Sequence, residues 1–261
     1  MRLEGLHHVT AITADALANA DFYAGVLGLR RFEPRGDEVF YGDRDGAAGS
    51  LVAFLEQPRA AQGRASAGMV HELSWRVAGE AALDFWAERL AAVGRPVERH
   101  TAALTSSDPE GLAFELLVAN VDDPPLTSVA DGIPAEHALQ GLHGVRAYTR
   151  DPAASERVLK AFNFEAGPGG LSHRVGGGQS HAVYVYDHPP GDPGFQGAGT
   201  VHHVAWSARP DEHGSWRTLA QMAGVRPTEV AGDPPAFEFV EPSGVRFEIV
   251  PALAYGSTSP S

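Results

Sequence analysis

Gly5-Leu6-His7-His8-Val9 is the stretch that decides the fold, because the chain of 261 residues repeats its pattern three more times. The copies begin about 60 to 70 residues apart, which is too far for a small solenoid repeat. Each copy has the apolar character of a short strand. The later copies are Met69-Val70-His71-Glu72-Leu73, Gly141-Leu142-His143-Gly144-Val145 and Thr200-Val201-His202-His203-Val204.

A helix is expected after each opening strand, followed by further short strands. In the first unit the helix runs from Asp15 to Leu27 and ends at Gly28, with an apolar face at helical spacing. That face consists of Leu17, Ala20, Ala24 and Leu27. The other expected helices include Leu83 to Val93, Asp151 to Phe162 and Asp211 to Ala223, and alternating runs such as 50–55, 181–186 and 237–240 predict strands.

The second and fourth units also end alike. Asp108-Pro109-Glu110-Gly111 followed by Leu112 to Leu116 matches Glu241-Pro242-Ser243-Gly244 followed by Val245 to Ile249. An acid-Pro-x-Gly sequence favours a turn, which places a Phe-Glu pair on the returning strand. We therefore expect an N-terminal pair of units at 1–119, a linker at 120–138, a C-terminal pair at 139–252 and a flexible tail at 253–261.

Composition excludes several classes of function. A formal charge of −13 disfavours nucleic acid and anionic membranes as partners. No apolar run approaches the roughly 20 residues that span a bilayer, and the first residues lack the pattern of a signal peptide. A cytoplasmic protein is therefore expected. Because the chain has no Cys, any metal must be held by His and carboxylate side chains.

The four openings differ at the second His position, which is His8, Glu72, Gly144 and His203 in chain order. The first position is always His, namely His7, His71, His143 and His202. Because neighbouring strand residues point to opposite faces, we expect the two positions to have different roles. The variable position is the better ligand candidate, since only some units need to contribute a ligand. With Glu248, His8 and His203 form the two-His, one-carboxylate set of non-haem Fe(II) oxygenases.

The same comparison predicts the number of ligands. The carboxylate follows the hairpin glycine by four residues in Gly244 to Glu248, and the equivalent position after Gly49 is Ala53, which has no donor. Three protein ligands would leave open positions, as a catalytic metal requires. Glu56 is a poorer candidate for a fourth ligand. The counterpart site near Glu115, which has Glu72 and Gly144 at the His positions, is expected to have lost metal binding.

These motifs resemble the vicinal oxygen chelate superfamily, which includes glyoxalases, bleomycin-resistance proteins and extradiol dioxygenases. Asp21-Phe22-Tyr23-Ala24-Gly25-Val26-Leu27-Gly28-Leu29 is similar to its usual helix sequence, and the paired His-His motifs with Phe247-Glu248 are most like hydroquinone-type ring-cleaving dioxygenases. The resemblance implies an α+β fold of four βαβββ modules. The modules would be paired into two halves, each with a curved mixed sheet around a cavity and helices outside.

The resemblance also implies a reaction. It places Fe(II), with Mn(II) as an alternative, on His8, His203 and Glu248, and gives supporting catalytic roles to His7, His202 and Thr10. The partners would be a dihydroxylated aromatic ring, such as a hydroquinone or catechol, and O₂, with homo-oligomerisation left open. Family members carry an Arg and a Tyr ahead of the Glu ligand. In the corresponding stretch here, 230–239, Glu238 stands where the Tyr would be and no Arg is present, which disfavours an anionic ring.

Two other functions stay open at this point. One is a glyoxalase-like isomerase or lyase, which usually has four protein ligands; Glu56 or Glu238 would have to replace the donor that Ala53 lacks. The other is a metal-free protein that binds and sequesters small molecules. His71 and His143 are expected to have structural roles, and Trp75, Trp86, Trp206 and Trp216 are expected in the core.

Overall fold

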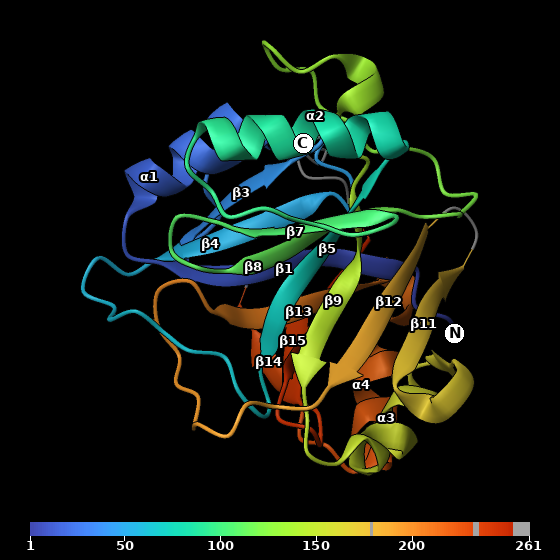
Figure 1. Cartoon of the computed structure of the whole chain (residues 1–261). Coiled ribbons are helices and arrows are strands. Elements are labelled where there is room, and N and C mark those ends of the chain that lie inside the picture. Colours follow the sequence, from blue (N-terminus) through green and yellow to red (C-terminus); the bar gives the residue numbers. More distant parts are fainter. Residues whose placement is uncertain (178–179, 232–234, 253–261) are drawn as a thin grey trace.

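The computed structural model describes residues 1–177, 180–231 and 235–252, so the predicted tail at 253–261 lies outside the described residues. The chain forms two eight-stranded mixed sheets. Helices α1 and α2 lie together at one end of the molecule, and α3 and α4 lie together at the other (Figure 1). The helices stand outside the sheets. The α+β fold implied by the family resemblance is confirmed.

The first sheet joins the first and fourth units. Its strand order is β14-β15-β16-β13-β1-β4-β3-β2. At its centre β1 and β13 pair antiparallel, and β4 and β16 run parallel to them on either side. Its strands are β1 (Gly5–Thr13), β2 (Arg30–Arg31), β3 (Glu38–Gly42), β4 (Leu51–Glu56), β13 (Val201–Ala208), β14 (Thr228–Val230), β15 (Ala236–Val240) and β16 (Arg246–Pro251).

The second sheet joins the second and third units in the same way, in the order β10-β11-β12-β9-β5-β8-β7-β6. Each sheet therefore contains strands from both sides of the linker at 120–138. The division of the chain into two segments at that linker remains a proposal. The strands are β5 (Val70–Val77), β6 (Glu98–Arg99), β7 (Ala103–Ser107), β8 (Ala113–Val118), β9 (Leu142–Tyr148), β10 (Glu165–Ala166), β11 (Ser172–Gly177) and β12 (Ser180–Asp187).

The first helix differs from the sequence prediction. Asp15 caps it by accepting a hydrogen bond from the backbone N–H of Ala18 at 3.0 Å, but the α-helix soon changes to a π-helical turn. The wider turn changes the helical spacing, so Leu17 is 80% exposed while Phe22 and Tyr23 enter the core; the core position predicted for Leu17 is wrong. The helices are α1 (Ala16–Ala20), π (Asp21–Val26), α2 (Glu80–Ala92), α3 (Glu156–Ala161) and α4 (His213–Ala223), with 3₁₀ turns at Ala135–His137, Pro152–Ser155, Pro168–Gly170 and Pro210–Glu212.

The two hairpin acids connect units that do not share a sheet. Asp108 is buried and accepts a hydrogen bond from the Tyr23 hydroxyl of the first unit at 3.1 Å. Glu241 is buried and accepts hydrogen bonds from the hydroxyls of Tyr184 and Tyr186 of the third unit. Burial raises the pKa of Asp108 to about 6. The acids that begin the turns thus also form hydrogen bonds that join the first unit to the second and the third unit to the fourth.

A β-bulge lies at every first-His position. In β1, Leu6 pairs with Trp206 and His8 with Ala205, which leaves His7 as the extra residue. The shifts in the register of β13, β5 and β9 leave His202, His71 and His143 as extra residues in the same way. A bulge interrupts the alternation of side chains and turns one of them to a new direction. The expectation that the two His positions point to opposite faces is therefore wrong.

The apolar core is continuous across the units. All four tryptophans are buried as predicted, and Trp206 packs against Phe164 and Phe247. Within the described residues, no helix has the length and apolar character needed to cross a membrane.

Candidate metal centre

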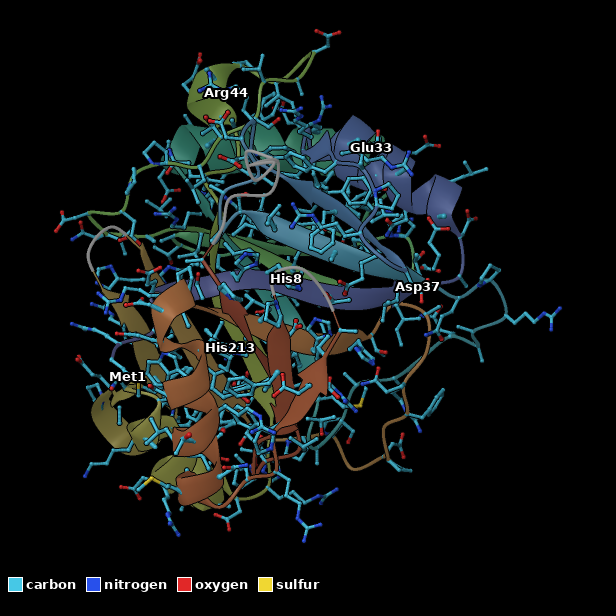
Figure 2. All side chains as sticks on the ribbon, turned by 180° about the vertical axis from the view of Figure 1, so that it is seen from behind. Met1, His8, Glu33, Asp37, Arg44 and His213 are labelled. Atoms are coloured by element: carbon cyan, nitrogen blue, oxygen red, sulfur yellow. The ribbon has the colours of Figure 1, made fainter. Side chains whose placement is uncertain are left out.

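The centre of the first sheet brings the three predicted ligands together. His8 lies on β1, His203 on the antiparallel neighbour β13, and Glu248 on β16 beside it. Figure 2 shows His8 on the strand that crosses the middle of the molecule. All three residues are buried, at 4–8% exposure. Among the described residues this is the one group of His and acidic side chains whose donor atoms lie within 4.8 Å of one another.

The spacing of the donor atoms fits a divalent cation. The two Nε2 atoms are 3.3 Å apart, and Glu248 Oε2 lies 3.1 Å from His203 Nε2 and 3.8 Å from His8 Nε2. Ligands on adjacent octahedral positions about 2.1 Å from an ion lie about 3 Å apart. The three atoms face one point, where an ion can accept electron pairs from all of them. The residues present therefore fit a metal of the kind that His and carboxylate ligands prefer.

His7 and His202 lie behind the two histidine ligands. His7 Nδ1 is 2.8 Å from His8 Nδ1, and His202 Nδ1 is 3.0 Å from His203 Nδ1. When Nε2 of a ligand faces the ion, its Nδ1–H needs an acceptor, and that acceptor fixes the tautomer and the ring orientation. The β-bulge makes this contact between sequence neighbours. Each His-His pair thus consists of a ligand candidate and the side chain that orients it.

The rings of His8 and His202 have lowered pKa values, which favours the neutral state, and a neutral His is the form that binds a metal. Burial, with the neighbouring His7 and His203, lowers the pKa of His8 well below its usual value. Burial, with His203 and Arg246, lowers the pKa of His202 to about 4. A neutral His202 can accept the Nδ1–H of His203.

Replacing His202 with Phe should weaken metal binding without abolishing it. The ring shape is kept, but His203 Nδ1–H loses its acceptor, a change that typically costs 10–100-fold in metal affinity. The affinity can be measured by titrating Mn(II) into metal-free protein. His202→Asn, which offers a carbonyl acceptor, should recover part of the loss. A His202→Phe variant with unchanged Mn(II) affinity would show that His202 does not orient the ligand.

Thr10 contacts Glu38, a residue near the cluster that the sequence analysis did not identify. The Thr10 side chain is fully buried and donates a hydrogen bond to Glu38 Oε1 at 2.8 Å. Glu38 Oε1 lies 3.8 Å from His203 Nε2. Burial raises the pKa of Glu38, while Thr10 and His203 oppose the shift. Glu38 begins β3 outside every repeated motif, so no spacing in the sequence marks it.

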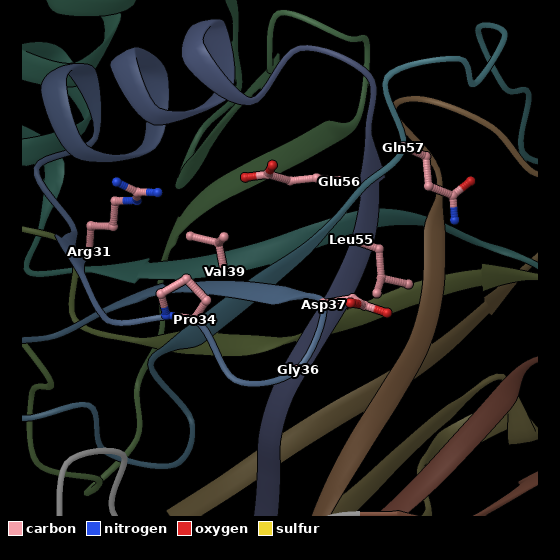
Figure 3. Close-up of a pocket in the computed structure, with 8 residues that line it drawn as sticks. All are labelled: Arg31, Pro34, Gly36, Asp37, Val39, Leu55, Glu56 and Gln57. Atoms are coloured by element: carbon pink, nitrogen blue, oxygen red, sulfur yellow. The ribbon is translucent and has the colours of Figure 1, made fainter.

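The other two acids considered as ligands lie elsewhere. Glu56 is exposed at the end of β4 and lines a separate pocket of about 570 Å³ with Arg31 and Val39 (Figure 3). Glu238 forms an ion pair with Arg246, two residues before Glu248. Neither acid belongs to the metal-binding group of the described residues. Ala53 is buried beside Thr10 and contributes no donor.

A small cavity of about 100 Å³ adjoins the cluster, and His202, His203 and Arg246 are among the residues that line it. The sequence analysis did not consider Arg246, because it looked for the Arg of the family only in the stretch 230–239. Part of that stretch, 232–234, lies outside the described residues. The ion pair with Arg246 offsets the charge of Glu238, so the acid does not by itself disfavour an anionic ring.

At the corresponding position in the second sheet, the side chain of Arg146 places a positive charge beside Glu72. The Arg146 guanidinium lies 3.6 Å from Glu72 and forms two hydrogen bonds with Asp187, at 2.6 and 2.9 Å. His71 bonds the same Asp187 at 2.9 Å, in accord with a structural role. Burial and Glu115 raise the pKa of Glu72 to about 7. That this counterpart does not bind a metal remains a prediction, and the position of Arg146 gives it a physical reason.

Comparison with known proteins identifies relatives along most of the chain. The family model described as "Glyoxalase/Bleomycin resistance protein/Dioxygenase superfamily" matches residues 5–116. "Putative ring-cleaving dioxygenase MhqE" of Bacillus subtilis (strain 168) is 31% identical over 271 residues, covering 95% of this chain and 87% of that protein. "Chlorohydroquinone/hydroquinone 1,2-dioxygenase" of Sphingobium indicum is 27% identical over 228 residues, covering 78% of this chain and 70% of that protein.

A solved structure extends the similarity to three dimensions. The crystal structure of a protein described as a "putative dioxygenase" from Bacillus subtilis superposes with a TM-score of 0.86 at 28% identity, covering 96% of this chain and 86% of that one. The similarity therefore includes both sheets and the centre between β1 and β13. The chain belongs to the glyoxalase/bleomycin resistance protein/dioxygenase superfamily, as an enzyme of its dioxygenase branch.

Proposed function

We propose that the chain is an Fe(II)-dependent ring-cleaving dioxygenase that opens a dihydroxylated aromatic ring, such as a hydroquinone or a catechol, with O₂. The observation that carries this proposal is the convergence of His8, His203 and Glu248 at the centre of one sheet. Two His and one carboxylate leave open positions on non-haem Fe(II), which is what oxygenases of this type need. The names of the relatives support the same class of reaction.

In this proposal each residue has a defined task. His8, His203 and Glu248 would hold the ion, which would supply the redox chemistry between ring and O₂. His7 and His202 would keep the ligand rings in one tautomer through their Nδ1 contacts with His8 and His203. The buried strands exclude water from the centre, which strengthens its electrostatic interactions. Mn(II) prefers similar ligands and is the alternative ion.

The test is oxygen consumption by anaerobically prepared protein loaded separately with Fe(II), Mn(II) and Zn(II). Hydroquinone and catechol should drive O₂ uptake with Fe(II) or Mn(II) and not with Zn(II), because Zn(II) has no redox chemistry. The ring should lose its aromatic absorbance in step with oxygen. Protein that retains only zinc and consumes no O₂ with any phenol after Fe(II) loading would contradict the proposal. It would favour a glyoxalase-like isomerase or a binding protein.

A further inference from the structure

A second carboxylate lies near the candidate metal centre, and it comes from a strand nearer the opposite edge of the first sheet from Glu248. Glu38 belongs to β3, which is separated from β13 by β4 and β1. Its side chain is 22% exposed and reaches back over the sheet, so that Oε1 lies 3.8 Å from His203 Nε2. This places a carboxylate beside the cluster in addition to that of Glu248.

Thr10 holds this carboxylate in position. Its hydroxyl donates to Glu38 Oε1 at 2.8 Å, and Thr10 is itself paired with His203 across β1 and β13. The Thr10 side chain is completely buried, so the hydroxyl is fixed by the strand that also carries His8. The carboxylate of Glu38 is therefore held by a residue of β1, the strand that carries His8, at the position paired with His203.

Glu38 lies beside the proposed metal ligands without belonging to their compact group of donor atoms. The donor atoms of His8, His203 and Glu248 form a group within 4.8 Å that does not include Glu38. A carboxyl group keeps acceptor capacity in either protonation state. A hydroxyl near the open positions of the ion could donate to it, whereas an ether or a bare ring could not.

We propose that Glu38, positioned by Thr10, accepts a hydrogen bond from the second hydroxyl group of the bound ring and thereby selects dihydroxylated rings over phenols with one hydroxyl. This inference rests on the proposed function, because it assumes that a ring binds at the metal centre. It assigns Thr10 the role of a positioning residue.

The experiment measures the binding of three rings to Fe(II)-loaded protein without O₂. Phenol serves as the ring with one hydroxyl, and catechol and hydroquinone as the rings with two. Glu38→Leu should weaken the binding of at least one two-hydroxyl ring about tenfold and leave phenol binding unchanged, since a hydrogen bond to a carboxylate of this kind corresponds to about one order of magnitude. Thr10→Val should give a smaller loss in the same direction. Asp37→Asn, which alters the neighbouring acid on the separate pocket, is the matched control and should change nothing.

Four results would overturn the inference. An equal loss of affinity for all three rings would show that Glu38→Leu only disturbs packing. Loss of iron from Glu38→Leu would show that Glu38 is a ligand. Unchanged binding of catechol and hydroquinone would show that Glu38 does not contact the ring, while the proposed function would stand. Wild-type protein that holds iron and binds none of the rings would refute the proposed function as well.

Discussion

Glu248→Ala should remove the bound metal from the protein. The substitution takes away the carboxylate whose Oε2 lies 3.1 Å from His203 Nε2, and it leaves the imidazoles of His8 and His203 as the only proposed protein ligands. Loss of a residue that merely orients a ligand costs 10–100-fold in metal affinity, so loss of the ligand itself should cost more than about a hundredfold. Metal content of anaerobically prepared protein, and Mn(II) titration of metal-free protein, measure the effect.

The repeat provides the matched control, because Glu115 is the residue that corresponds to Glu248 in the second unit. Its Oε2 accepts a hydrogen bond from Ser74, and it lies in the sheet that carries Arg146. Glu115→Ala should retain the full metal content. The assignment of the site would be wrong if both variants kept their metal, or if Glu115→Ala lost it.

Gly144→Ala should destabilise the protein strongly. A Cβ at this position would lie 1.9 Å from the carbonyl oxygen of Val183 on the paired strand β12, far inside van der Waals contact. The oxygen belongs to the backbone of β12, and the position of the Cβ is fixed by the backbone of β9. The two strands could separate only by breaking hydrogen bonds between them. We expect the free energy of unfolding to fall by about 3 kcal/mol or more, at the upper end of the usual cost of overpacking. Urea unfolding measures the change.

Gly25→Ala is the control for this prediction, because a Cβ there meets no atom within 4 Å. It should leave the stability nearly unchanged. A Gly144→Ala variant as stable as wild type would mean that β9 and β12 are not as close as described. The close approach also explains why the third unit has Gly at the position that corresponds to His203: a His at 144 would have no room for its Cβ.

Much of the fold could be predicted because the repeat acts as an internal comparison. The shared openings and the matching hairpins identify the strands that carry His8, His203 and Glu248. A site shared by the first and fourth units also follows, because only those units have His at the variable position, whereas the pairing of these two units within one sheet was not predicted. Local turn chemistry is sufficient for these elements, since each hairpin is marked by an acid, a proline and a glycine.

The rest depends on features that period and spacing do not encode. A π-helical turn after Ala20 exposes Leu17, and no residue in the stretch marks the change of helix type. The bulge at His7 places neighbouring side chains together, against the alternation of an ordinary strand. Glu38 reaches the centre across two other strands, so its role follows only from tertiary structure.

The most direct measurement is the fate of isotopically labelled O₂ in a single turnover of Fe(II)-loaded protein with hydroquinone or catechol. If His8, His203 and Glu248 hold an iron that cleaves the ring, mass spectrometry should find both labelled oxygen atoms in one ring-opened product, with none formed by Glu248→Ala. A product containing no labelled oxygen, or an intact ring after every loading with Fe(II), would contradict the proposed dioxygenase.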